Sequence, residues 1–98
     1  MNVNISSLHF KTDSKLEDFI QKKLNKLTGR YDGVLGSDVI LKLDKSDSHE
    51  NKVAEIKLNL KGMELFAKKQ SKTFEEATDM AVDALKKQIE KHKERFKK

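Results

Sequence analysis

The sequence predicts an α+β fold in which two helices, packed side by side, cover one face of a four-stranded mixed sheet. Four segments alternate apolar and polar residues, as strands with one buried face do. Two longer segments repeat apolar residues every third or fourth position, as amphipathic helices do. Their order along the chain is β-α-β-β-β-α, and a length of 98 residues suits one small domain spanning residues 1–98.

The predicted strands are residues 2–8, 39–43, 54–60 and 63–69. The third has the clearest alternation, and Lys61 with Gly62 after it fits the turn of a hairpin. Residues 30–37 contain two glycines and are interpreted as a turn-rich connection, while the polar residues 44–52 predict an exposed loop. Because each helix has one apolar stripe and the strands are polar at alternate positions, both helices should cover the same sheet face.

The first predicted helix covers residues 12–26. Either Thr12 or Ser14 can cap its first turn, and Gly29 fits a left-handed stop. Lys23 falls inside the apolar arc of this helix, where an unpaired ammonium would be costly to bury. We therefore expect its stem to lie along the edge of the core while its charged head reaches outward.

The second predicted helix runs from residue 74 to residue 98 without glycine or proline, and Thr73 with Glu76 fits a capping box at its start. Asp79 and Asp83 share one face of this helix and are predicted to be solvated surface groups. The apolar stripe consists of Phe74, Ala77, Ala81, Leu85, Ile89, His92 and Phe96.

Positive charge is concentrated at the end of the chain. Residues 86–98 hold seven Lys or Arg against two Glu, a net charge of +5, whereas residues 1–85 hold fourteen residues of each sign. Lysines at i, i+7 and i+11 also form a basic edge on each helix: Lys15, Lys22 and Lys26 on the first, and Lys86, Lys93 and Lys97 on the second. Such an excess points first to nucleic acid and second to an acidic protein or membrane surface. A solubilising helix end is the plainer alternative.

Several classes of chemistry have no support in the sequence. The chain has no cysteine, and His9, His49 and His92 are not at metal-ligand spacing from one another. We find no nucleophile–base pair and no glycine-rich phosphate loop, so we expect no enzyme, cofactor, metal or small-molecule substrate. No signal peptide and no apolar stretch of the roughly 20 residues that a membrane span needs are present. A soluble, cytoplasmic protein with no membrane partner is therefore expected.

Particular segments are similar to a known family. The element order, the segment QKKLNKL at residues 21–27 and above all the run DALKKQIEKHKERFKK at residues 83–98 resemble the ribosome hibernation-promoting factor and ribosome-associated inhibitor A family. The run is close to the family pattern Asp-x-Leu-x-Arg-Gln-Leu-x-Lys-His-Lys, and the likeness covers nearly the whole chain. The family usually opens this helix with Asp-Met-Tyr where this chain has Thr73, Phe74 and Glu75.

The resemblance implies a function without catalysis. Members of the family bind the small ribosomal subunit in the channel that messenger and transfer RNA use, so translation inhibition and protection of idle ribosomes during stress or stationary phase are expected. The small subunit is the expected partner, and a ribosome-dimerisation helper protein is a further candidate. The chain ends about where short members end, so ribosome pairing by this chain alone is not implied. By position, the residues that would contact ribosomal RNA are Lys22, Lys23, Lys26, Lys86, Lys87, Lys91, Lys93 and Arg95.

Two alternatives stay open on the sequence. A double-stranded RNA-binding domain shares the α-β-β-β-α core, but it needs a lysine-rich start to its second helix, where Glu75, Glu76 and Asp79 stand here. A protein-interaction module could instead dock its basic helix on an acidic partner. Its binding would survive nuclease treatment, whereas ribosome binding would not.

Overall fold

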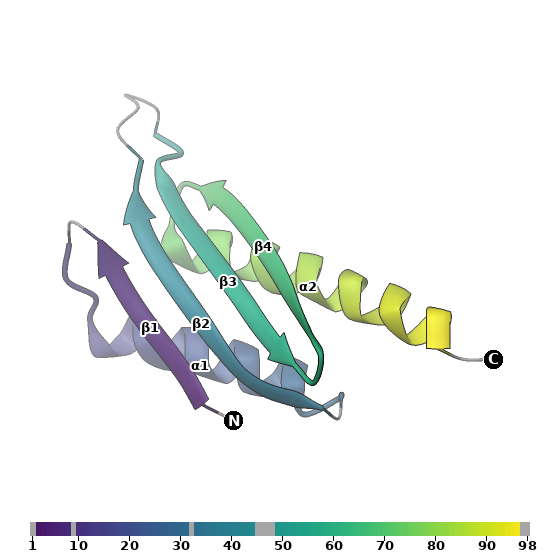
Figure 1. Ribbon diagram of the computed structural model, residues 1–98. Coiled ribbons are helices and arrows are strands. Elements are labelled where there is room, and N and C mark those ends of the chain that lie inside the picture. Colours follow the sequence, from purple (N-terminus) through teal and green to yellow (C-terminus); the bar gives the residue numbers. More distant parts are fainter. Residues whose placement is uncertain (1, 9, 32, 45–48, 97–98) are drawn as a thin grey trace.

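The computed structural model has the predicted element order and one four-stranded sheet (Figure 1). It describes residues 2–8, 10–31, 33–44 and 49–96, with side chains placed for those between residues 3 and 91. Expectations for His9, His92, Phe96, Lys97, Lys98 and residues 45–48 therefore lie outside the described residues or side chains. The elements are β1 (Asn2–Leu8), α1 (Ser14–Thr28), β2 (Val34–Leu43), β3 (Lys52–Leu60), β4 (Met63–Ser71) and α2 (Phe74–Phe96).

The strands lie in the order β1-β2-β3-β4. β1 pairs with β2 in parallel and the other two pairs are antiparallel, which confirms the mixed sheet. One row of small and β-branched side chains crosses all four strands, because Ile5 pairs with Val39, Val39 with Ile56, and Ile56 with Ala67. Gly62 turns β3 into β4 with φ at 84°, a conformation that favours glycine.

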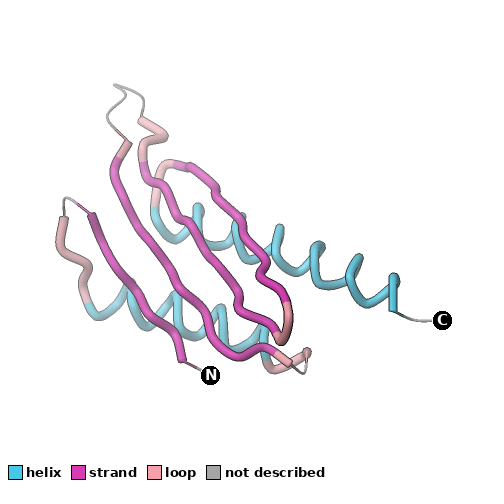
Figure 2. The backbone as a smooth tube through the Cα atoms, viewed as in Figure 1, coloured by secondary structure: helices cyan, strands magenta, loops and turns pink. Residues whose placement is uncertain are grey.

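Both helices lie on one face of the sheet, as predicted (Figures 1 and 2). In the view of Figure 1, α1 passes behind β1 and β2, and α2 behind β3 and β4. The core fills the space between the helices and the sheet, and its least exposed members are Ile20, Leu24, Leu41, Ala54, Ile56, Leu58, Ala77, Ala81 and Leu85. These residues hold the two helices against the same surface and therefore side by side. None of the described helices is long and apolar enough to cross a membrane.

β2 begins earlier than predicted. The segment interpreted as a connection turns into strand at Val34, and Gly36 lies within the strand where its pairing with β3 shifts register. An irregularity of this kind favours a residue without a side chain, so glycine here marks a bulge and not a turn. Ser37 is buried just after it and donates a 3.1 Å hydrogen bond to the carbonyl oxygen of Lys57.

Both ends of α1 differ in detail from the prediction. The cap is Asp13, whose Oδ1 accepts a 2.8 Å hydrogen bond from the backbone N–H of Leu16. Gly29 at the other end has φ −65° and ψ −17°, which is right-handed, so the expected left-handed stop is wrong. Its N–H donates to the carbonyl oxygen of Asn25 at 2.9 Å, which continues the helical path for one more residue.

The start of α2 is capped by the predicted residue. Thr73 Oγ1 accepts a 3.0 Å hydrogen bond from the N–H of Glu76, but the Glu76 carboxylate accepts from the Ser71 hydroxyl at 2.7 Å instead of completing a capping box. Phe74 stacks on Phe10 with ring centroids 4.6 Å apart. This stack fixes the start of α2 beside the segment that links β1 to α1.

Candidate nucleic-acid interface

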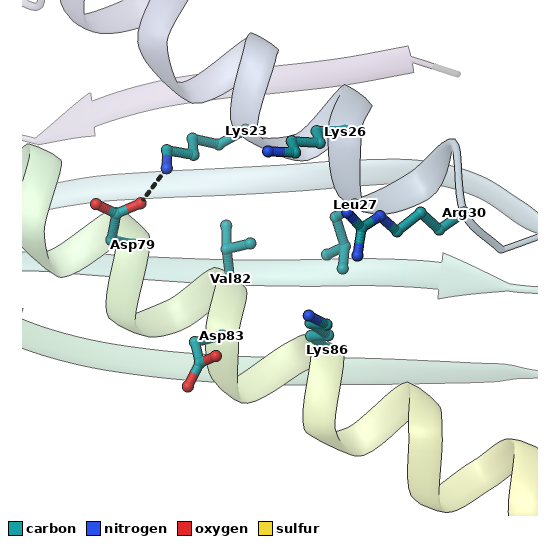
Figure 3. A pocket seen from close by; sticks show the side chains of 8 residues that line it. All are labelled: Lys23, Lys26, Leu27, Arg30, Asp79, Val82, Asp83 and Lys86. Carbon is teal, nitrogen blue, oxygen red and sulfur yellow. Dashed lines mark ion pairs between the residues drawn. The ribbon is translucent and has the colours of Figure 1, made fainter.

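A groove runs between the two helices on the side of the molecule away from the sheet (Figure 3). Its volume is about 240 Å³. Leu27 of α1 and Val82 of α2 form its apolar floor, and charged side chains rise from both helices around it. The charged lining consists of Lys23, Lys26, Arg30, Asp79, Asp83 and Lys86.

The structure brings together three of the predicted site residues in this groove. Lys23 and Lys26 come from α1, and Lys86 comes from α2. Arg30, which is not among the predicted site residues, joins them from the turn that follows α1. Four cations thus line one surface although they come from two segments far apart in the sequence.

Arg30 lies just beyond the end of α1 and reaches the groove because the backbone of Gly29 is right-handed. The Arg30 N–H donates to the carbonyl oxygen of Leu27 at 3.3 Å, and the turn that this bond closes leaves the Arg30 side chain in the groove with Lys23 and Lys26. Arg30 was not predicted to join these lysines, because the glycine before it suggested a left-handed cap that would turn the chain away from the helix axis.

Lys23 is the best-fixed cation of the groove. Its Nζ lies 2.8 Å from Asp79 Oδ1 on α2 and 5.5 Å from the centre of the Phe19 ring. The lysine and aspartate side chains are 40% and 52% exposed, so the pair lies at the water-facing edge of the helix contact. This agrees with the expected path of the Lys23 stem along the core edge, and it gives Asp79, predicted to be a solvated surface group, an ion-pair partner.

The two carboxylates of the groove, Asp79 and Asp83, lie in ion pairs with lysines, which leaves the other cations of the groove unpaired within the described part of the chain. Asp79 is paired with Lys23, and Asp83 lies 3.3 Å from Lys87, four positions further along α2. By contrast, Lys26, Arg30 and Lys86 have no ion pair with any described residue. The positive end of the groove is therefore the end formed by these three cations, hereafter the cation cluster.

The other predicted site residues lie elsewhere. Lys22 is exposed on α1 outside the groove, and Lys91 is exposed on α2. Lys87 is 73% exposed and lines a separate hollow toward β4, next to Met80. Lys93 and Arg95 belong to the described backbone of α2, but their side chains lie outside the described set.

The arrangement can bind an anion. Within the described residues there is no cluster of three metal-ligating side chains. Lysine and arginine at a helix–helix groove can neutralise phosphates, and the arginine fork can contact two phosphate oxygens at once. Such contacts position a nucleic-acid backbone without reading its bases.

Comparison with known proteins identifies a protein family and related sequences. A family model described as Sigma 54 modulation protein / S30EA ribosomal protein matches residues 3–97. A ribosome hibernation promoting factor of Pseudomonas putida is 33% identical over 95 residues, which cover 97% of this chain and 89% of that protein.

Solved structures show the same architecture. The N-terminal domain of Thermus thermophilus Protein Y superposes with a TM-score of 0.80 at 27% identity, covering 94% of this chain and 99% of that one. A ribosomal subunit interface protein from Coxiella burnetii has a TM-score of 0.85 at 19% identity, covers 95% of this chain and 98% of that one, and shares the fold.

Proposed function

Since the chain belongs to the Sigma 54 modulation protein / S30EA ribosomal protein family, we propose that it is a ribosome hibernation factor. In this proposal it binds ribosomal RNA of the small subunit, in the channel that messenger and transfer RNA use. Occupying that channel inhibits translation and protects idle ribosomes during stress or stationary phase. The activity is then binding itself, with no catalysed reaction, and takes place in the cytoplasm.

The observation that carries this proposal is the shared groove of α1 and α2. Lys26 reaches it from α1, Arg30 from the turn after α1, and Lys86 from α2, all without carboxylate partners among the described residues. A phosphate bound there would contact both helices. Each neutralised phosphate releases condensed counterions, so the affinity for RNA would fall steeply with salt concentration.

The fold supports occlusion because it holds the two helices rigidly. Leu24 of α1 and Leu85 of α2 are both fully buried against the sheet. The Lys23–Asp79 ion pair adds a direct link between the helices. A surface fixed in this way can recognise the shape of folded RNA without rearranging, which limits the entropy lost on binding.

The proposal is tested by sedimentation. The protein should co-sediment with small subunits or whole ribosomes on a sucrose gradient at low salt, leave them at high salt, and suppress translation in a cell extract. Nuclease digestion of the ribosomes should abolish the association. Retention after digestion would instead favour a module that docks an acidic protein.

A triple charge reversal tests the basic half of α2. Lys87→Glu, Lys91→Glu and Lys93→Glu together should weaken co-sedimentation with little loss of folding, since these positions lie outside the apolar stripe. If the triple variant co-sediments as well as the parent, these lysines do not contribute to RNA binding. Adding a candidate ribosome-dimerisation helper to the same gradients would test whether such a partner acts with this chain.

The start of α2 argues against a generic double-stranded RNA-binding domain. Glu75 and Glu76 are exposed in its first turn, where that domain type needs lysines to meet phosphates. In this proposal the RNA contacts come instead from the middle and end of α2 together with α1. A simple RNA duplex should accordingly bind far more weakly than the small subunit.

A further inference from the structure

The two edges of the sheet differ in how they are protected. β1 pairs with β2 along one edge, and no described residue pairs with its other edge. Residues 2–8 contain neither a charged residue nor a proline. An edge strand with these properties offers a free row of backbone N–H and C=O groups to another strand.

The opposite edge, along β4, carries groups that hinder pairing with another strand. Gln88 of α2 reaches across β4 and its Nε2 donates a 2.9 Å hydrogen bond to the backbone carbonyl oxygen of Phe66. β4 also carries Lys68 and Lys69. Lysines on an edge strand and contacts that cover its backbone are common means of preventing edge-to-edge association. Among the described residues β1 has neither, so its edge is the less protected of the two.

The flank of α1 beside β1 is also compatible with a second protein surface. If the helix is viewed along its axis with Ile20 facing the sheet, Lys23 and Lys26 turn toward α2. The opposite flank, on the side of the β1 edge, carries Glu17, Gln21, Asn25 and Thr28. None of the lysines of α1 lies on that flank, so a neighbour at the β1 edge would not meet this helix's positive charge.

We propose that the free edge of β1 pairs in antiparallel fashion with β1 of a second copy of this chain. The two four-stranded sheets then join into one continuous sheet. All seven residues of β1 overlap only in the register centred on Ile5, in which Ile5 faces Ile5 of the second copy and Val3 faces Ser7. Val3 and Ile5 are half-buried at the edge of the core in the single chain, and this pairing covers them further.

Pairing in this register leaves the basic surface free. The two-fold axis runs perpendicular to the joined sheet, so the helices of both copies remain on the same face. The cation clusters of both copies therefore point the same way. Self-association and RNA binding thus use different surfaces, and each can be measured without the other.

The first test is the mass in solution. Sedimentation equilibrium between about 10 µM and 1 mM should show the weight-average mass rising from 11.3 kDa toward twice that value. Ser6→Lys places a lysine on the exposed side of β1 and should weaken association at least about tenfold. Met80→Lys adds the same charge at an exposed position on α2, near β4, and should leave association unchanged.

The second test is the register. The chain has no cysteine, so Ile5→Cys introduces a single thiol at the proposed two-fold axis. Directly opposed strand residues have Cα atoms about 4.5–5.5 Å apart, which suits a disulfide. Mild oxidation should cross-link this variant faster than Met80→Cys, although the thiol at residue 80 is the more exposed.

Either of two results overturns the proposal. One is a mass that stays at 11.3 kDa over the whole concentration range. The other is association that Ser6→Lys leaves intact, because it would place the interface away from β1. Urea unfolding of each variant, with a midpoint equal to that of the parent, establishes that lost association is not lost folding.

Discussion

Lys23 of α1 and Asp79 of α2 form the one ion pair between the two helices within the described residues, with Nζ and Oδ1 2.8 Å apart. The pair closes one end of the groove and leaves the cation cluster at the other. It therefore has two opposing effects on the proposed function. It holds the helices together, and it neutralises a lysine that could otherwise contact phosphate.

Asp79→Asn separates these two effects. Both side chains of the pair are exposed to water, so the variant should lose less than about 1 kcal/mol in the free energy of unfolding. Its affinity for small subunits should rise several-fold at low salt, because a negative charge leaves the groove and Lys23 becomes available. Binding titrations at several KCl concentrations measure this.

The matched control for Asp79→Asn is Glu64→Gln. Glu64 is exposed on the uncovered face of the sheet, so its neutralisation raises the net charge equally but away from the groove. Affinity should respond much less to this change. Similar gains for both variants would show that total charge, and not the groove, sets the affinity.

The cation cluster predicts which individual residues contact phosphate, whereas the basic edges of the two helices indicated only a general positive surface. Lys26→Ala, Arg30→Ala and Lys86→Ala should each weaken binding to small subunits and reduce the slope of log K against log salt by about 0.9. The expected reason is the loss of one phosphate contact in each case. Lys22→Ala, which removes an exposed lysine outside the groove, should change the slope by less than half as much.

The Lys22→Ala variant tests whether the groove is the centre of the RNA-binding surface. If Lys22→Ala lowers the slope as much as the three cluster variants do, the RNA contacts extend over the outer surface of α1. The groove would then not be the centre of the interface.

The sequence was sufficient to predict the parts of this fold that depend on local patterns. Alternation predicted the strands, and the three-to-four spacing predicted both helices and their shared sheet face. The predictions were wrong at glycines, because a glycine can mark either the end of an element or an irregularity within or beside it. Gly36 suggested a turn but lies in a bulged strand, and Gly29 suggested a left-handed cap but caps α1 with a right-handed backbone.

The candidate site was only partly predictable for a different reason. Periodicity places Lys23 and Lys26 on one helix flank, but it does not say which flank faces the other helix. That depends on how both apolar stripes pack on the sheet, so the partnership of Lys23 with Asp79 could not be read from either segment alone. Arg30 was missed because it follows a glycine that was expected to turn the chain away from the helix.

Thr78 provides a prediction on stability. It is fully buried on α2, and its hydroxyl has no hydrogen-bond partner among the described residues. A buried hydroxyl without a partner costs about 1–3 kcal/mol, and valine replaces it with a methyl group of similar shape. Thr78→Val should therefore raise the free energy of unfolding by about 1 kcal/mol in urea titrations.

The control for Thr78→Val is Thr28→Val, at the end of α1. Thr28 is only half-buried, and its hydroxyl donates to the carbonyl oxygen of Asn25 at 3.4 Å. This variant should be neutral or slightly destabilising. A loss of stability in Thr78→Val would indicate that the hydroxyl has a partner, such as a bound water, that stabilises the fold.

Asp38 on the uncovered sheet face should make stability depend on pH. Hydrogen bonds donated by Asn4 at 3.1 Å and by Asn59 at 3.3 Å hold the pKa of this carboxyl below its ordinary value of 3.8; they outweigh the opposing effect of burial, and the nearby charge of Lys57 adds the weakest contribution. Since the folded state favours the ionised form, the stabilising contribution is complete above pH 3.8 and is lost as the pH falls through the folded-state pKa.

An NMR titration of the side-chain carboxyl carbons measures this pKa directly. Asn4→Ala should raise the pKa of Asp38 more than Asn59→Ala does, because the hydrogen bond from Asn4 is the largest cause of the shift. Asp38→Asn should remove this contribution to the loss of stability at low pH, which urea titrations at pH 7 and about pH 3 would reveal. A pKa for Asp38 at or above 3.8 in the parent protein would contradict the hydrogen-bonded geometry.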